Sequence, residues 1–312
     1  MKDVTVSIYV ATYNHENYIT RALDSILMQK TRYSYEVFVG EDCSTDNTRL
    51  VLKEWEQRHP GVFTILYRPE NMSKQAVSNT QDIKNRCKGK YLIALEGDDF
   101  WTDPEKLEKQ VTFLEEHPEY YAVAHNCTVV GADSLPNGEI YPECKEEEYT
   151  MRHFASDILP GQLTTLLTRN YMTDPKFDRS LTDLRAGPGD RRVYFSILCH
   201  GRIYCMQETM SAYRHIVSGG SSFSATHRYS YEKEELNCRS VLDYAYRIGH
   251  RDAIKYAEML YLRNIRYASR KKLVKKERAF EDVKRIRNRP RAAALLLKRD
   301  INYRIFHKAL HV

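Results

Sequence analysis

KYLIALEGDD, residues 90–99, is the stretch on which the fold assignment rests. Residues 90–95 are dense in apolar side chains, which is typical of a strand buried on both faces of a sheet. Glu96, Asp98 and Asp99 follow at once, so three carboxylates stand in four residues directly after the strand. The pattern predicts a buried strand whose carboxyl end carries hard oxygen ligands.

Upstream of this stretch the chain alternates between strand and helix patterns. Short β-branched runs predict strands, and apolar residues at helical spacing between them predict helices. The expected strands are 4–11, 35–40 and 63–67, and the expected helices are 15–29, 44–58 and 75–87. Such alternation with short connections predicts a mostly parallel central sheet flanked by helices, an α/β fold.

Ligands bind such sheets at the carboxyl ends of the strands. The residues that follow the first two strands are therefore site candidates beside the carboxylates at 96–99: Thr12, Tyr13 and Asn14, then Glu41 and Asp42. A carboxylate at 42 could accept the imide N–H of a uracil or thymine base. Asp46, a little further on, is expected to cap the helix that follows.

Downstream the pattern becomes mixed and then wholly helical. We expect a helix from Pro104 to His117 and strands at 120–130, 162–168 and 202–206. From about Tyr229 no strand pattern remains. Residues 263–312 carry 17 Lys and Arg against 4 Asp and Glu, whereas the first 262 residues have a balance of −7. This basic tail is either a solvated face or a surface that meets an anionic membrane; nucleic-acid binding is not expected, because no known binding module is present.

Composition narrows the class of protein. The chain has 312 residues, of which 42% are hydrophobic and 29% charged, which is typical of a soluble globular protein. Its seven cysteines form no C-x-x-C pair, and the N-terminus lacks the apolar core of a signal peptide. We therefore expect a cytoplasmic protein. If the tail meets a membrane rather than forming a solvated face, that membrane surface is the inner face of the cell membrane.

The loops also exclude two common nucleotide-binding devices. Residues 11–18 contain no glycine, which argues against a dinucleotide-binding enzyme, and no Walker-type phosphate loop occurs. Phosphate would then be handled by Mg²⁺ or Mn²⁺ held on the carboxylates at 96–99. The alternative for these carboxylates is an acidic turn leading into the next helix. Asp190 also has two possible roles: it could be the N-cap of the helix that follows, or a general base.

Three segments together resemble a known family: VSIYVATYNHENYITRALDSILMQ at 6–29, YEVFVGEDCSTDNT at 35–48 and KGKYLIALEGDDFWTDPEKLEKQ at 88–110. They are similar to family 2 glycosyltransferases of the GT-A fold, of the bacterial type that builds capsule, exopolysaccharide or lipopolysaccharide. The resemblance covers roughly residues 4–225. It implies a catalytic domain over 1–225, with a nucleotide-binding half at 1–103 and an acceptor half at 104–225. A basic helical extension, 226–312, follows.

The resemblance also implies roles for individual residues. Thr12, Tyr13 and Asp42 would surround the nucleobase and ribose, and Glu96, Asp98 and Asp99 would fill the metal-binding region, with Asp98 and Asp99 as ligands of Mn²⁺ or Mg²⁺. Asp190 would be the catalytic base. Arg214 and His215, with the 218–222 segment, would close over the diphosphate. Because no Q-x-x-R-W motif follows Asp190, addition of a single sugar is expected rather than polymerisation.

The implied activity is inverting, metal-dependent transfer of a hexosyl or N-acetylhexosaminyl group from a nucleotide-sugar, with UDP favoured. The acceptor would be the hydroxyl of a carbohydrate or a lipid-linked oligosaccharide. Two alternatives remain: an inactive GT-A-like scaffold or binding protein, and another metal-dependent nucleotide enzyme such as a nucleotidyltransferase. The second would release pyrophosphate rather than a nucleoside diphosphate.

Overall fold

The computed structural model describes residues 4–75, 77–184, 189–216 and 230–308, with the backbone alone for 301–308. The chain divides into two compact units. We call the first the sheet unit; it holds Met1–Tyr149, Leu159–Phe177 and Gly201–Thr226. We call the second the helical unit; it holds Thr150–Ile158, Asp178–His200 and His227–Val312. The domain boundary expected near residue 225 falls outside the described residues.

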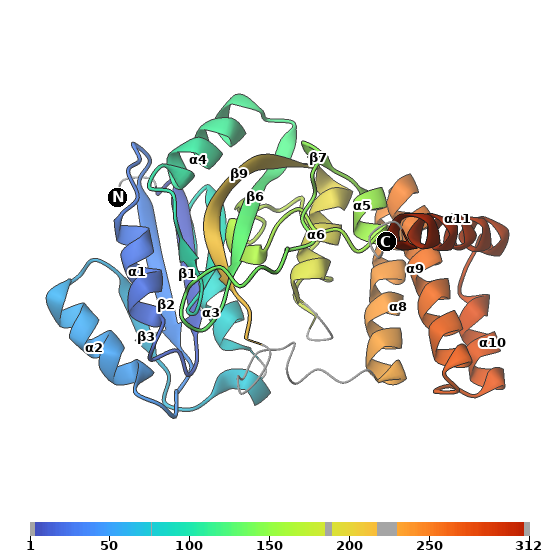
Figure 1. Ribbon diagram of the computed structural model, residues 1–312, viewed down its shortest axis with the longest axis horizontal. Coiled ribbons are helices and arrows are strands. Elements are labelled where there is room, and N and C mark those ends of the chain that lie inside the picture. The colour runs from blue at the N-terminus through green and yellow to red at the C-terminus, as the bar shows by residue number, and fades with distance from the viewer. Residues whose placement is uncertain (1–3, 76, 185–188, 217–229, 309–312) are drawn as a thin grey trace. The chain divides into compact units, whose positions relative to one another are not determined.

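The sheet unit contains nine strands of one sheet and the helices around it (Figure 1). The strands are β1 Val6–Thr12, β2 Tyr35–Glu41, β3 Thr64–Tyr67, β4 Tyr91–Glu96, β5 Phe100–Trp101, β6 Tyr120–Val130, β7 Glu148–Tyr149, β8 Leu167–Arg169 and β9 Arg202–Arg214. The helices are α1 Ile19–Leu27, α2 Thr48–Arg58, α3 Asn79–Arg86 and α4 Lys106–Glu116, with 3₁₀ turns η1 Met72–Lys74 and η2 Leu163–Thr165. The sheet order is β3-β2-β1-β4-β8-β6-β9-β5, and β7 pairs with β9.

The first four strands of this order form the parallel half that the alternating pattern predicts. β1 pairs with both β2 and β4, so that Thr12 lies opposite Glu41 and Ala11 opposite Glu96. The carboxyl ends of the three strands therefore meet at one edge. The other half is mixed rather than mostly parallel. β8 runs antiparallel to both β4 and β6, whereas β6 and β9 are parallel.

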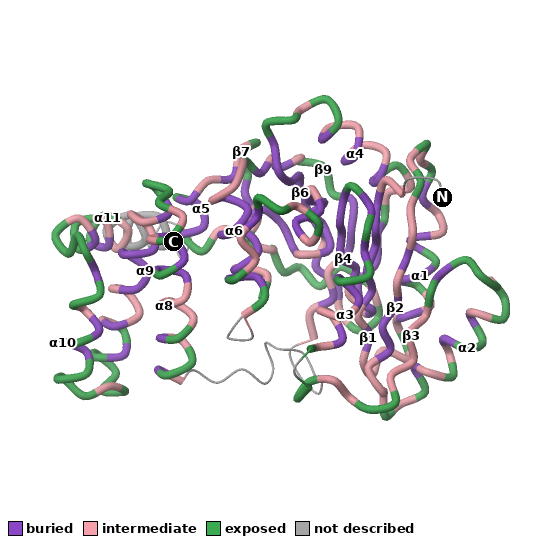
Figure 2. The backbone as a smooth tube through the Cα atoms, turned by 180° about the vertical axis from the view of Figure 1, so that it is seen from behind, coloured by how far each residue is buried: buried purple, intermediate pink, exposed green. Residues whose placement is uncertain are grey.

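Apolar side chains on both faces of the central parallel strands build the core, and Figure 2 shows β1 and β4 as largely buried. In β1, every residue from Val6 to Val10 is buried, because helices cover both faces. The close packing of α3 on β2 requires a glycine. A Cβ added at Gly40 would stand 2.3 Å from Cδ1 of Ile83 and 2.4 Å from Oδ1 of Asn79.

Two strand boundaries differ from the sequence-based expectation. The strand expected at 162–168 begins instead as η2, because the side chain of Gln162 accepts the Thr164 N–H, and only β8 is extended. The strand expected at 202–206 runs on to Arg214. Gln207, Glu208 and Thr209 are exposed, and the pairing with β6 shifts register nearby, so the apolar pattern is interrupted while the strand continues. Tyr213 and Arg214 thus lie on a strand, not in a loop.

The helical unit confirms the expected helical C-terminal region. Its helices are α5 Met151–Ala155, α6 Gly189–His200, α8 Tyr231–Ile248, α9 Arg251–Arg270, α10 Lys276–Lys284 and α11 Arg289–Lys308. α8 ends at Gly249, whose φ of 76° allows a sharp turn into α9. Buried tyrosines fasten the helices together: the Tyr261 hydroxyl donates to Glu235 at 2.7 Å and the Tyr231 hydroxyl donates to Asp282 at 2.7 Å. Within the described ranges, no helix is both long and apolar enough to cross a bilayer.

Candidate functional site

Backbone hydrogen bonds connect the carboxyl ends of β1, β2 and β4 just beyond the last paired residues of these strands. The Asp42 N–H donates to the Thr12 carbonyl at 3.0 Å, and the Gly97 N–H donates to the Ala11 carbonyl at 3.0 Å. Thr12 is buried, and its neighbour Tyr13 is half-buried. The structure therefore brings the predicted residues Thr12, Asp42 and those after Glu96 to one edge of the sheet.

Asp42 is held in a fixed orientation by the segment after β3. Its Oδ1 accepts the Met72 N–H at 2.8 Å, and its carbonyl accepts from the Asn71 side-chain amide at 3.0 Å. Burial raises the pKa of Asp42, although the Met72 N–H and the charge of Arg68 oppose the rise. Met72 and Arg68 also line an open pocket of about 360 Å³. A carboxylate in this position could accept a hydrogen bond from a flat ring.

Glu41 and Asp46 have structural roles instead. Glu41 is fully buried, and its carboxylate accepts the Ser44 N–H at 2.5 Å and the Arg49 Nε–H at 2.6 Å. Asp46 accepts the Thr48 N–H at 2.9 Å at the start of α2, although the N-cap position is that of Asn47 and not, as expected, of Asp46. These two carboxylates fix the loop between β2 and α2, whereas Asp42 bonds to Met72, one of the residues that line the pocket.

His15, which sequence analysis did not single out, lies against the acidic segment after β4. Its Nε2 is 3.9 Å from Oδ2 of Asp98, and its Nδ1 is 3.3 Å from the Thr12 hydroxyl. Burial lowers the pKa of His15, with the charge of Asp98 opposing. Gly97 permits this approach, because a Cβ there would stand 2.7 Å from both His15 Nδ1 and Thr12 Oγ1. The only indication of this residue in the sequence was that a histidine stands within the polar run 12–18, directly after the first strand.

Asp98 and Asp99 have different environments. The Asp98 side chain is 30% exposed, whereas Asp99 is only 2% exposed. One oxygen of Asp99, Oδ1, accepts the Arg214 N–H at 2.7 Å, and Oδ2 has no hydrogen-bond partner among the residues that the structure describes. Burial and the neighbouring charge of Asp98 raise the pKa of Asp99 well above its usual value.

Arg214 is buried, and its guanidinium is bonded to the protein itself. Nε donates to the Asp98 carbonyl at 2.9 Å, Nη1 to the carbonyls of Gly131 and Ala132, and Nη2 to the Ser134 hydroxyl at 2.8 Å. The guanidinium carbon also lies 4.0 Å from the centre of the Tyr18 ring. Arg214 thus links the Asp98-Asp99 segment to the 131–134 turn.

His215 fixes the same turn at its far end. Its Nδ1 lies 2.5 Å from the Glu139 carboxylate, and its N–H donates to the Val130 carbonyl at 3.0 Å. The structure therefore brings Arg214 together with Asp98 and Asp99, whereas the side chain of His215 contacts Glu139. The 218–222 segment, expected to act with them, lies outside the described residues.

The carboxylates after β4 fit a divalent cation by their chemistry. Mg²⁺ and Mn²⁺ sites on phosphate substrates need only one or two carboxylates, because waters and phosphate oxygens complete the shell. Asp98 is accessible, and the unpaired buried Oδ2 of Asp99 lacks a partner that a cation or water would supply. Over the described part of the chain, no group of three or more His, Cys, Asp or Glu side chains is arranged to hold a metal by itself.

Asp190 belongs to the helical unit. It lies half-buried in the first turn of α6, and its Oδ1 accepts the N–H of the next residue, Arg191, at 2.8 Å. The Pro188 turn before it lies outside the described residues.

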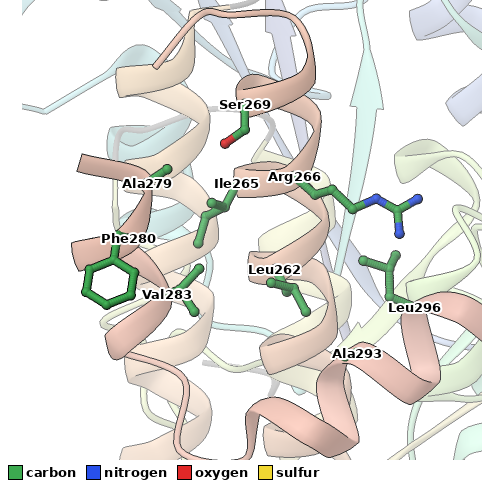
Figure 3. A pocket seen from close by; sticks show the side chains of 9 residues that line it. All are labelled: Leu262, Ile265, Arg266, Ser269, Ala279, Phe280, Val283, Ala293 and Leu296. Atoms are coloured by element: carbon green, nitrogen blue, oxygen red, sulfur yellow. The ribbon is translucent and has the colours of Figure 1, made fainter. Parts of the chain in front are cut away.

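A second, larger pocket has different chemistry. Figure 3 shows a hollow of about 390 Å³ between α9, α10 and α11 of the helical unit. Its lining residues are Leu262, Ile265, Arg266, Ser269, Ala279, Phe280, Val283, Ala293 and Leu296. This apolar lining, with no carboxylate, does not suit a nucleotide diphosphate.

Comparison with known proteins explains the arrangement at the sheet edge. Residues 7–157 match the family model described as Glycosyl transferase family 2. The match covers just under half of the chain and includes the strands β1 to β4 with the acidic segment after β4. The structure is also similar to that of S. aureus TarS 1-349 in complex with UDP-GlcNAc, with a TM-score of 0.61 and 20% identity over 85% of this chain and 73% of that one. The two thus share the GT-A fold.

Two relatives show how far the likeness extends along the sequence. The uncharacterized protein Rv1520 of Mycobacterium tuberculosis is 33% identical over 224 residues, which cover 69% of this chain and 60% of that protein. The putative teichuronic acid biosynthesis glycosyltransferase TuaG of Bacillus subtilis is 27% identical, over 70% of this chain and 81% of that protein. The chain thus spans about 60% of the length of its mycobacterial relatives.

Proposed function

We propose that this family 2 protein transfers a single sugar from a nucleotide-sugar to an acceptor hydroxyl in bacterial cell-surface polysaccharide synthesis. One observation carries the proposal: the ends of β1, β2 and β4 bring Thr12, Asp42 and Asp98 to one edge of the sheet. This is where ligands bind in such sheets. The named relatives in polysaccharide synthesis and the UDP-GlcNAc bound to TarS support it.

In the proposed arrangement, Thr12, Tyr13 and Asp42 contact the nucleoside. Asp42 is oriented by Met72 N–H and accepts the imide N–H of uracil, which is why UDP is the favoured nucleotide. Glu96 and Asp98 approach the sugar and diphosphate. Arg214 and His215 keep the acidic segment and the 131–139 turn in place, and the Arg214 guanidinium adds positive charge near the diphosphate.

Mn²⁺ or Mg²⁺, held by Asp98 and Asp99, would neutralise the charge of the departing nucleoside diphosphate. The protein's own contribution begins with the orientation of Asp99 by the Arg214 N–H. We assign to Asp190 the role of general base, which takes the proton of the acceptor hydroxyl as that hydroxyl attacks the anomeric carbon, with inversion. This assignment rests on its position in the sequence resemblance.

A donor panel tests the proposal. UDP-, GDP-, dTDP- and CMP-sugars are titrated calorimetrically with Mn²⁺ or with EDTA, and release of the nucleoside diphosphate is followed. We expect one nucleotide class to bind with the metal. Asp42→Asn and Asp98→Asn should weaken this binding, while Glu54→Gln, an exposed carboxylate change on α2, should not. A folded chain that binds none of the four would contradict the proposal. In a parallel assay with nucleoside triphosphates and a sugar 1-phosphate, release of pyrophosphate would indicate a nucleotidyltransferase instead.

Asp190→Asn separates binding from transfer. Loss of the base should abolish sugar transfer and leave donor affinity unchanged, because the proton is taken from the acceptor. Near-normal transfer by this variant would remove Asp190 from the mechanism.

We also propose that the helical unit attaches to an anionic membrane surface, where a lipid-linked acceptor would be found. Leu273 and Phe280 are 50% and 65% exposed beside the exposed basic residues 271, 272, 275 and 276. Apolar side chains among lysines suit an anionic interface. Phe280→Ser should reduce sedimentation with phosphatidylglycerol vesicles, and Leu50→Ser, on α2 of the sheet unit, should not. Equal binding by both variants would refute this attachment.

A further inference from the structure

A small pocket in the helical unit is lined by three arginines. Its volume is about 110 Å³, and Arg191 and Arg192 of α6, Asn237 of α8 and Arg263 of α9 take part in the lining. We call it the arginine pocket. It lies outside the sheet edge described above and is formed wholly by residues of one unit. Its size suits a single charged group.

The arginines around this pocket outnumber the carboxylates that pair with them. Asp157 accepts from Arg191 at 3.2 Å, from Arg263 at 2.7 Å and from Arg299 at 2.6 Å. Burial alone would raise the pKa of Asp157, but the three arginines, Arg263 foremost, lower it instead. The pKa of Arg299 is itself lowered, by burial and then by the charge of Arg263. One carboxylate thus faces three guanidinium groups.

Arg192 adds a buried cation that is incompletely bonded. It is 4% exposed; Nη2 donates to the Leu184 carbonyl at 2.6 Å and Nη1 to the Asn237 side chain at 3.3 Å. Its Nε has no hydrogen-bond partner within the described residues. Glu234 lines the same pocket, and Asp190 attracts Arg192. Asp300 attracts Arg299 but also pairs with Arg266, so five arginines face four carboxylates. A buried cation with an unpaired donor favours an anionic partner.

We propose that the arginine pocket binds the oxyanion group, phosphate or carboxylate, of an anionic acceptor substrate. This inference rests on the proposed function and names the acceptor class. Arginine forks match the geometry of phosphate and carboxylate oxygens. Arg191 and Arg192 directly follow Asp190, the proposed base, in the same helix. An anion bound there would therefore position an acceptor by the helix that carries the base.

The test uses inorganic phosphate as the probe, titrated calorimetrically into the full chain at constant ionic strength. Arg263→Gln should abolish binding, but it also breaks the pair with Asp157. Asn237→Asp is the sharper variant, because it places a carboxylate in the pocket and keeps every arginine. It should fold normally, since the new carboxylate pairs with Arg192, and weaken phosphate binding about tenfold. Asn85→Asp makes the same charge change on the exposed face of α3 and should bind as wild type.

Parallel titrations with methyl phosphate and glucuronate identify which oxyanion the pocket prefers. Equal phosphate affinity in wild type and Asn237→Asp, or no binding to the wild type, would overturn the proposal. Nucleotide-sugar binding is measured in the same variants. Asn237→Asp should leave it unchanged, so failure of the arginine pocket and failure of the transferase proposal give different results.

Discussion

Replacing Arg214 by methionine tests whether this arginine acts by organising the site. Methionine keeps the apolar stem over the Tyr18 ring but removes the donors to Asp98, Gly131, Ala132 and Ser134. Each hydrogen bond from a charged donor contributes about 1.5–3 kcal/mol, and loss of the buried charge itself offsets part of the sum. We expect the free energy of unfolding to fall by about 3 kcal/mol, within a range of about 2–5 kcal/mol.

Thermal unfolding of the variant provides the measurement. For a folding unit of 150–250 residues, such as the sheet unit, about 3 kcal/mol corresponds to a fall in Tm of roughly 6–12 °C. Arg21→Met is the matched control. Arg21 also stacks on an aromatic ring, 3.6 Å from the centre of Phe100, but is exposed, so we expect a Tm change below about 2 °C.

Donor affinity distinguishes organisation from direct contact. The Met variant keeps the backbone N–H bond to Asp99. If the Arg214 side chain acts through the Asp98 carbonyl and the 131–134 turn, this variant loses stability and metal-dependent donor binding together. An unchanged Tm with a large loss of nucleotide-sugar affinity would refute the reasoning and place the guanidinium on the ligand.

Three further predictions follow from single contacts. Gly97→Ala should weaken donor binding and lower Tm, because the added Cβ would stand 2.7 Å from Thr12 Oγ1 and His15 Nδ1; unchanged calorimetric affinity and Tm would contradict this. Burial lowers the pKa of Lys106 well below its usual value, so the folded state binds fewer protons than the unfolded state and its stability should rise with pH towards about 10. Lys106→Met should flatten that rise and raise the urea midpoint at pH 7, because among the residues that the structure describes the buried amine bonds to Gln110 alone and otherwise lies over the Trp101 ring; an identical pH profile would be inconsistent with the burial. Glu139→Gln should loosen the turn that His215 fixes and speed amide exchange at residues 131–139, with no change at α2; equal exchange would show that the contact is dispensable.

Much of the nucleotide-binding half could be predicted from local patterns. The parallel pairing of β1 with β2 and β4 follows from short apolar strands that alternate with helices, and the parallel-sheet rule then places Thr12, Asp42 and Asp98 at one edge. The mixed half was less predictable. The end of β9 was predicted too early because of the polar run Gln207–Thr209. These residues are exposed near a shift in the pairing register, so the apolar pattern that predicts a strand is interrupted there.

The sequence alone determined the order of the strands and helices up to residue 96, the family resemblance and the presence of carboxylates after the strands, because these depend on neighbours within a few positions. Only the tertiary structure decided which of those groups are bonded to one another. Arg214 meets Asp99 across 115 positions, and Arg299 meets Asp157 across 142. Such contacts depend on how strands and helices pack, and no local pattern records them. The same packing separates the accessible Asp98 from the buried Asp99 beside it.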